Sequence, residues 1–160
     1  MIDLNAVGGG QCGYDLLAAQ LEALLDGERD FIANAAQLSA FLYSQVEDLN
    51  WAGFYLARGE ELVLGPFQGQ VACVRIPFGR GVCGAAAATR QTQRVEDVHA
   101  FPGHIACDSA SNSELVIPLV KGGALIGVLD LDSPVLARFG EQDQAGLERL
   151  ARIFLDSTDC

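Results

Sequence analysis

Hydrophobic residues repeat with a helical period near the start of the chain and at its end, and with a strand-like period between. Apolar residues recur at three- and four-residue spacing over 14–25, 30–49 and 141–155, which predicts three amphipathic helices. Short apolar runs bounded by turn residues predict strands at six places: 51–56, 61–64, 71–76, 93–95, 114–120 and 124–132. This order predicts an α+β fold, in which N- and C-terminal helices flank a central, mostly antiparallel sheet of five or six strands.

The size and charge of the chain restrict its class. Its 160 residues fit one domain, 1–160, with 1–13 as a flexible lead-in. A net charge of −11 argues against nucleic acid and anionic membranes as partners, since both attract clustered Lys and Arg. No apolar run approaches the roughly 20 residues of a membrane helix, and 1–5 lacks signal-peptide features. We therefore expect a cytoplasmic protein.

A glycine-rich stretch, 79–84 (GRGVCG), matches the G-x-G-x-x-G pattern of dinucleotide-binding folds. However, Pro77 and Phe78 separate it from the preceding strand, and a hairpin follows instead of a second βαβ unit. We interpret the stretch as a tight turn that begins a helix, whose backbone N–H groups can bind a substrate carboxylate.

Three of the five cysteines call for an explanation, namely Cys73, Cys83 and Cys107. Burial explains a cysteine in a strand (Cys73) or in the first turn of a helix (Cys83). Cys107 lies in a long predicted loop, 99–112, where packing does not demand a thiol and reactivity becomes plausible. Cys12 and Cys160 lie near the ends and look incidental.

A Cys/His metal site is the alternative use of these thiols, because His99 and His104 precede Cys107. The spacings match no zinc motif, since ligand pairs normally come closer together and in repeated form. We therefore expect no metal.

Two carboxylates, Asp130 and Asp132, share one face of a predicted strand, because alternate residues point the same way. Lys121-Gly122-Gly123 predicts a hairpin that brings Glu114, at the start of the partner strand, close to them. Two interpretations remain open. The carboxylates are exposed at an edge, or they form an acidic pocket that holds an ammonium group or keeps one carboxylic acid protonated.

Six segments of the chain together resemble the free methionine-(R)-sulfoxide reductases, which are single GAF domains that act on the free amino acid. The segments stand in the family's order: 50–55 (NWAGFY), 64–68 (LGPFQ), 72–77 (ACVRIP), 81–84 (GVCG), 104–108 (HIACD) and 129–134 (LDLDSP). The resemblance runs from about residue 31 to 155.

The resemblance implies a thiol-dependent mechanism without a cofactor. Cys107 would attack the sulfoxide sulfur, release methionine and become a sulfenic acid. A second cysteine would then form a disulfide that thioredoxin reduces. We favour Cys73 as this resolving thiol, although a Cys83–Cys107 disulfide is also compatible with the pattern.

The resemblance also implies the substrate site. Glu114, Asp130 and Asp132 would hold the ammonium group and help protonate the departing oxygen, and Trp51 and Tyr55 would line an apolar wall for the S-methyl end. A homodimer and an antioxidant function under oxidative stress are further implications. The alternative function is a small-molecule-sensing GAF domain without catalysis.

Overall fold

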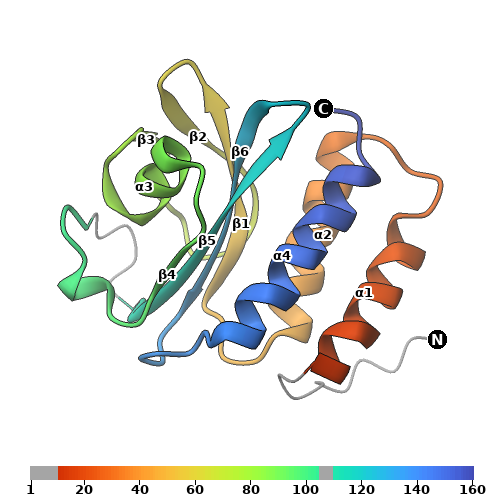
Figure 1. Cartoon of the computed structure of the whole chain (residues 1–160), viewed down its shortest axis with the longest axis horizontal. Helices are drawn as coiled ribbons and strands as arrows, with labels where there is room; N and C mark the ends of the chain where they lie inside the picture. Colours follow the sequence, from red (N-terminus) through yellow and green to blue (C-terminus); the bar gives the residue numbers. More distant parts are fainter. Residues whose placement is uncertain (1–10, 105–109) are drawn as a thin grey trace.

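A six-stranded antiparallel sheet forms the middle of the molecule (Figure 1). The structure is a computed structural model that describes residues 11–104 and 110–160. The strands lie in the order β3-β2-β1-β6-β5-β4. Their bounds are β1 Trp51–Arg58, β2 Glu61–Gly69, β3 Arg75–Pro77, β4 Gln93–Val95, β5 Ser113–Lys121 and β6 Ala124–Ser133. The predicted α+β class and antiparallel sheet are confirmed.

Helices cover both faces of this sheet, unequally. Three of them, α1 (Gln11–Leu25), α2 (Phe31–Gln45) and α4 (Glu141–Asp156), form a layer on one face (Figure 1). The single helix α3 (Gly81–Thr89) lies against the other face, near β3. The larger apolar core therefore lies between the three-helix layer and the sheet.

Alternation along β6 assigns its residues to the two faces. Leu129 and Leu131 are fully buried in the core under the three helices, whereas Val128 packs in the smaller cluster on the α3 side. Since successive side chains point to opposite faces, Asp130 and Asp132 share the α3 side with Val128. Because β6 pairs with β1 on one side and β5 on the other, these carboxylates lie in the middle of the sheet.

The β5–β6 hairpin closes at the predicted turn. Lys121 pairs with Ala124, and Gly122 and Gly123 between them have φ of 59° and 78°. Both values lie in the left-handed region that a two-residue hairpin of this kind requires, which explains the two glycines. A register shift between Leu119 and Val120 follows the turn, and the shifted register pairs Glu114 with Asp132.

Two sequence predictions need correction. The strand predicted at 71–76 is in fact β3, Arg75–Pro77; of the preceding residues, Val74 accepts a hydrogen bond from Leu64 N of β2, but this contact does not extend the strand. Trp51 Nε1 and Tyr55 Oη instead donate hydrogen bonds to the carbonyls of Gln70 and Cys73 (3.1 and 2.9 Å). In addition, α1 begins at Gln11, so the lead-in is shorter than 1–13 and Cys12 lies within a helix.

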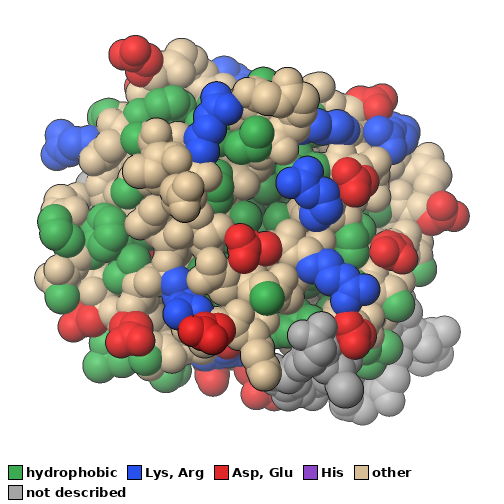
Figure 2. Space-filling model, viewed as in Figure 1, with side chains coloured by type: hydrophobic (Ala, Val, Ile, Leu, Met, Phe, Trp, Pro, Cys, Tyr) green, Lys and Arg blue, Asp and Glu red, His purple; other side chains and the backbone are tan. Residues whose placement is uncertain are grey.

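Charged side chains of both signs are spread over the face of the molecule seen in Figure 2, with hydrophobic side chains between them. The net negative charge therefore does not gather into one field on this face. Among the described residues, no helix is long and apolar enough to cross a membrane.

Candidate functional site

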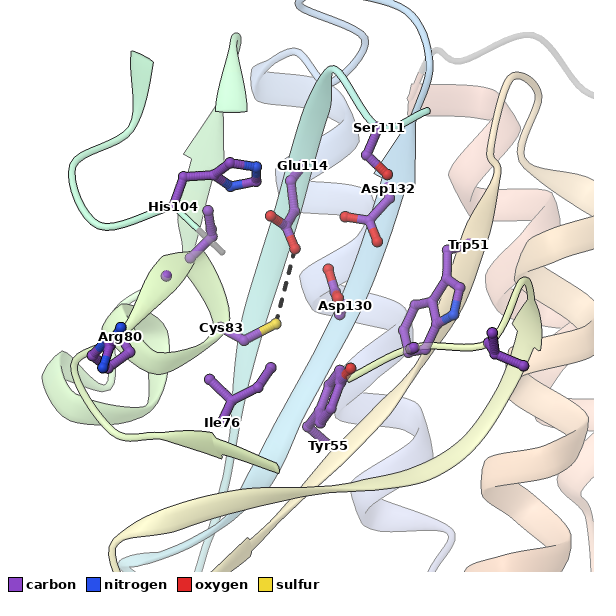
Figure 3. Close-up of a pocket in the computed structure, with 14 residues that line it drawn as sticks. Trp51, Tyr55, Ile76, Arg80, Cys83, His104, Ser111, Glu114, Asp130 and Asp132 are labelled. Atoms are coloured by element: carbon purple, nitrogen blue, oxygen red, sulfur yellow. Dashed lines mark hydrogen bonds between the residues drawn. The ribbon is translucent and has the colours of Figure 1, made fainter. Parts of the chain in front are cut away.

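A cavity lies between the sheet and α3, on the face opposite the three-helix layer (Figure 3). Side chains from β1, β5 and β6 form its floor, and α3 with the segments on either side of that helix forms its walls. The lining residues are Trp51, Tyr55, Val71, Ala72, Ile76, Arg80, Gly81, Val82, Cys83, His104, Ser111, Glu114, Asp130 and Asp132. All five substrate-binding residues implied by the resemblance are among them.

The three carboxylates converge in this cavity. Glu114 and Asp132 are directly paired across β5 and β6, and Asp130 lies on the same face of β6 (Figure 3). Glu114 is 8% exposed and Asp130 is 4% exposed, while Asp132 is partly buried. The interpretation as exposed edge charges is therefore wrong, because β6 is a central strand whose α3 side is covered.

Burial and neighbouring charges raise the pKa of two of these carboxyl groups. Loss of solvent, followed by the charge of Asp132, raises the pKa of Asp130 well above its usual value. Burial, followed by the charge of Asp130, does the same to the pKa of Glu114. Moreover, Asp130 Oδ1 is buried and has no hydrogen-bond partner among the described residues. A buried oxygen of this kind in a cavity wall is suited to accept a hydrogen bond from a ligand cation.

Cys83 lies in the first turn of α3, as expected, and its thiol lies beside the same cluster, which the sequence did not predict. Its thiol donates a 3.9 Å hydrogen bond to Glu114 Oε2 (Figure 3). Burial first, and then the charges of Asp130 and Glu114, raise the pKa of this thiol well above its usual value. The raised pKa disfavours the thiolate, which is the reactive form of Cys83.

The same cluster contains the described residues that could hold a metal ion. Cys83, Glu114 and Asp130 each place one potential ligand atom within 4.8 Å of the others. A metal ion binds the deprotonated form of each of these groups, whereas their surroundings raise all three pKa values. This opposition weakens metal binding. The expected absence of a metal stays a prediction.

Two stacked aromatic rings form the apolar wall of the cavity. The Trp51 ring lies 5.8 Å from that of Tyr55 and 5.2 Å from that of Phe67, centroid to centroid. Gly53, between Trp51 and Tyr55 on the same face, makes room for this arrangement: a Cβ there would lie 2.3 Å from Phe67 Cβ. The wall therefore depends on a glycine within β1.

The glycine-rich stretch is a tight turn, as predicted. Gly79 and Gly81 have φ of 84° and 64°, in the left-handed region. A Cβ on Gly84 would lie 2.6 Å from the Pro77 carbonyl oxygen, so this glycine allows α3 to approach β3 closely. The three glycines thus place Cys83 over the sheet, next to the carboxylates.

The remaining cysteines differ in state. Cys73 lies in the irregular segment before β3, is partly buried, and is disulfide-bonded. It is therefore not the buried strand cysteine considered from the sequence. Cys83 and Cys160 are free thiols. Cys107 and the side chain of Cys12 lie outside the described residues.

The sequence did not predict several residues of the cavity as part of a substrate site, among them Ile76, Arg80, His104 and Ser111. Arg80 precedes α3 and is the only Lys or Arg among the lining residues. Burial, followed by the charge of His99, lowers the pKa of His104 and keeps its imidazole neutral. Apart from the turn around Arg80, no local pattern marks these residues, because they come from separate segments.

Comparisons with known proteins agree with this architecture. The GAF domain family model matches residues 32–154. The chain is 58% identical over 137 residues to a free methionine-R-sulfoxide reductase of Escherichia coli, a match that covers 86% of this chain and 83% of the relative.

Two solved structures are similar over almost their whole length. The structure of fRMsr of Staphylococcus aureus in its reduced form has a TM-score of 0.89 and 45% identity, over 98% of this chain and 99% of that one. The free methionine-R-sulfoxide reductase of Neisseria meningitidis, solved in complex with its substrate, has a TM-score of 0.90 and 45% identity. This match covers 98% of this chain and 95% of that one.

Proposed function

The chain belongs to the GAF-domain free methionine-R-sulfoxide reductases, which are oxidoreductases, and we propose that it reduces the free amino acid by thiol chemistry recycled by thioredoxin. The observation that carries the proposal is the set of carboxyl groups that lie together beside an apolar wall in one cavity, two of them buried and with raised pKa values. A zwitterionic amino acid with an S-methyl end fits both parts of this cavity.

The substrate orientation follows from the polarity of the cavity. Its ammonium group would lie against the carboxylate cluster, where Asp130 Oδ1 accepts one of its hydrogen bonds. Its S-methyl end would lie against the rings of Trp51 and Tyr55. The walls from α3 and 71–76 border the space on both sides, and a cavity bounded in this way favours a small free amino acid over a residue in a protein chain.

The chemical step requires a nucleophile and a proton donor. The Cys107 sulfur would attack the sulfoxide sulfur while a carboxylic acid protonates the departing oxygen. The protonated oxygen then moves from the methionine sulfur to the Cys107 sulfur as the new bond between the two sulfurs breaks, so methionine leaves as a thioether and Cys107 is left as a sulfenic acid. Glu114 and Asp132, which are paired across β5 and β6, are the proposed donors, and burial followed by the charge of Asp130 raises the pKa of Glu114 well above its usual value.

Cys73 is proposed to resolve the sulfenic acid. Its thiol would attack the Cys107 sulfur and release water, which leaves a disulfide between the two. The disulfide-bonded state of Cys73 supports this role, whereas Cys83 is a buried free thiol bound to Glu114. Cys83 would then donate a hydrogen bond to Glu114 in the carboxylate cluster and take no part in thiol–disulfide exchange. Reduced thioredoxin would restore both cysteines, in a cytoplasmic setting.

The experiment follows NADPH consumption with thioredoxin, its reductase and free methionine-R-sulfoxide. Wild type and Cys83→Ser should turn over, because serine keeps a hydrogen bond to Glu114. Cys107→Ser should be inactive. Cys73→Ser should release one methionine per chain and then stop. Full turnover by Cys107→Ser would contradict the mechanism, and no turnover by wild type would favour the sensing function.

A further inference from the structure

Two strongly exposed valines flank Cys73. Val71 is 85% exposed and Val74 is 60% exposed, higher fractions than those of most large apolar residues in the described part of the chain. Both belong to the irregular segment 71–74, and Val71 with Ala72 also lines the cavity. An apolar surface therefore surrounds the partly buried Cys73 at the rim of the candidate site.

The backbone of this segment is held in place, so the exposure does not come from a loose loop. Trp51 and Tyr55 bind the carbonyls of Gln70 and Cys73 from inside the cavity. Leu64 N donates to the Val74 carbonyl at 2.9 Å. With these carbonyls directed towards the protein, the Val71 and Val74 side chains stay in solvent, although burial of each would be worth about 1.5–3 kcal/mol.

We propose that Val71 and Val74 form the docking surface for the dithiol protein, of the thioredoxin class, that reduces the disulfide at Cys73. This inference rests on the proposed function. The occupant follows from the disulfide, since exchange requires a partner thiolate to reach one of its sulfurs, and the partner must then cover the surface on either side. Transient redox contacts bury little area, so two valines beside the sulfur form a substantial part of such an interface.

The exchange at this surface is balanced. A thiolate of the partner attacks the Cys73 sulfur, the disulfide of Cys73 breaks, and the other enzyme sulfur leaves as a thiolate. The second thiol of the partner then attacks its own first sulfur, which breaks the mixed disulfide and releases Cys73 as a thiolate. The partner ends as a disulfide, and the enzyme holds two reduced cysteines that take up two protons.

The test compares a protein reductant with a small one. In Val71→Ser/Val74→Ser, the KM for reduced thioredoxin should rise about tenfold or more, since two apolar contacts worth about 0.8 kcal/mol per methylene are lost. The rate at which dithiothreitol reduces the oxidised protein, measured without sulfoxide, should stay within about twofold of wild type, because this reductant needs no docking surface and the measurement does not involve the substrate cavity that Val71 lines. The control Leu16→Ser/Ile32→Ser removes exposed apolar residues (46% and 67% exposed) from α1 and α2, on the opposite face of the sheet. It should change neither the KM for thioredoxin nor the rate with dithiothreitol.

A direct measurement separates this inference from the proposed function. Oxidised protein is mixed with reduced thioredoxin without any sulfoxide, and the appearance of free thiols is followed. The valine variant should react about tenfold more slowly than wild type, whatever the substrate is. An unchanged rate would overturn the docking surface, as would an equal loss with dithiothreitol. Failure of sulfoxide turnover by wild type would instead overturn the proposed function.

Discussion

The two faces of the sheet treat a buried carboxylate in opposite ways. Under the three-helix layer, Asp143 accepts hydrogen bonds from Tyr14 Oη (2.7 Å) and Gly140 N (2.9 Å), and pairs with Arg138. On the α3 face, Asp130 is buried among Glu114, Asp132 and Cys83, and one of its oxygens has no partner among the described residues. The contacts of Asp143 stabilise the fold. The crowding around Asp130 destabilises the fold, but it leaves a buried oxygen available to a ligand.

We therefore expect the helix-covered face to contribute mainly to stability and the α3 face mainly to the proposed activity. Buried and crowded carboxyl groups disfavour the folded state. We infer that the α3 face retains them for the proposed function, in which they bind an ammonium group and protonate the departing oxygen. The apolar contacts of the other face offset that cost. Substitutions on the two faces should therefore differ in kind as well as in size.

The largest expected effect is on the helix-covered face. Phe54 is fully buried against the rings of Phe31 and Phe154, so Phe54→Ala should lower the free energy of unfolding by about 3–5 kcal/mol. The neighbouring Tyr55 points to the cavity, and Tyr55→Phe should cost only about 1 kcal/mol, for the hydrogen bond to the Cys73 carbonyl. Urea unfolding measures both. If Phe54→Ala does not fold, Phe54→Leu should lose about 1–2 kcal/mol.

The next effect has the opposite sign. Asp130→Asn should raise the free energy of unfolding at neutral pH by about 1–2 kcal/mol, because it removes an ionisable group from a buried acidic cluster. The same variant should lower turnover about a hundredfold through weaker ammonium binding and altered protonation. Asp143→Asn is the matched control and should destabilise, since it weakens the contacts to Gly140 and Arg138. Changes of the same sign in both variants would contradict the comparison.

The smallest expected effect is the pH dependence of stability. Asp130 and Glu114 have raised pKa values in the folded state, so above about pH 4 the unfolded chain releases protons that the native chain keeps. Their contribution therefore lowers the free energy of unfolding as pH rises, by at most about 1.4 kcal/mol per pH unit for each retained proton. Urea midpoints of Glu114→Gln/Asp130→Asn should fall less between about pH 5 and pH 8 than those of wild type. Parallel curves would show that the cluster does not titrate as described.

Local patterns predicted much of this site. Strand alternation placed Asp130 and Asp132 on one face, and the Gly122-Gly123 turn brought the strand of Glu114 beside them, although the pairing of Glu114 with Asp132 also depends on a register shift between Leu119 and Val120 that was not predicted. Whether that face was buried stayed open, because α3 covers it from a distant part of the chain. Ile76, Arg80 and Ser111 join the cavity for the same reason, through contacts that no local pattern reports.

The error at 71–76 has a different cause. The run VACVRI has strand-forming side chains, and strand propensity largely reflects how such side chains pack. In the structure, Trp51 and Tyr55 take two of the backbone carbonyls of this region, and only β3 pairs with β2. These hydrogen bonds hold the segment outside the sheet and leave Val71 and Val74 exposed beside Cys73. The apolar character of the two valines alone would not predict this exposure.

The sequence by itself determined the elements and their order, the antiparallel pairing at the hairpin, and the motifs of the family, because these depend on periodicity and on residues near one another in the chain. Only the tertiary structure decided which side of the sheet is enclosed by α3, how crowded the carboxyl groups become, and that the segment around Cys73 leaves the sheet. Each of these depends on burial, and burial is set by elements that approach one another only when the whole chain packs.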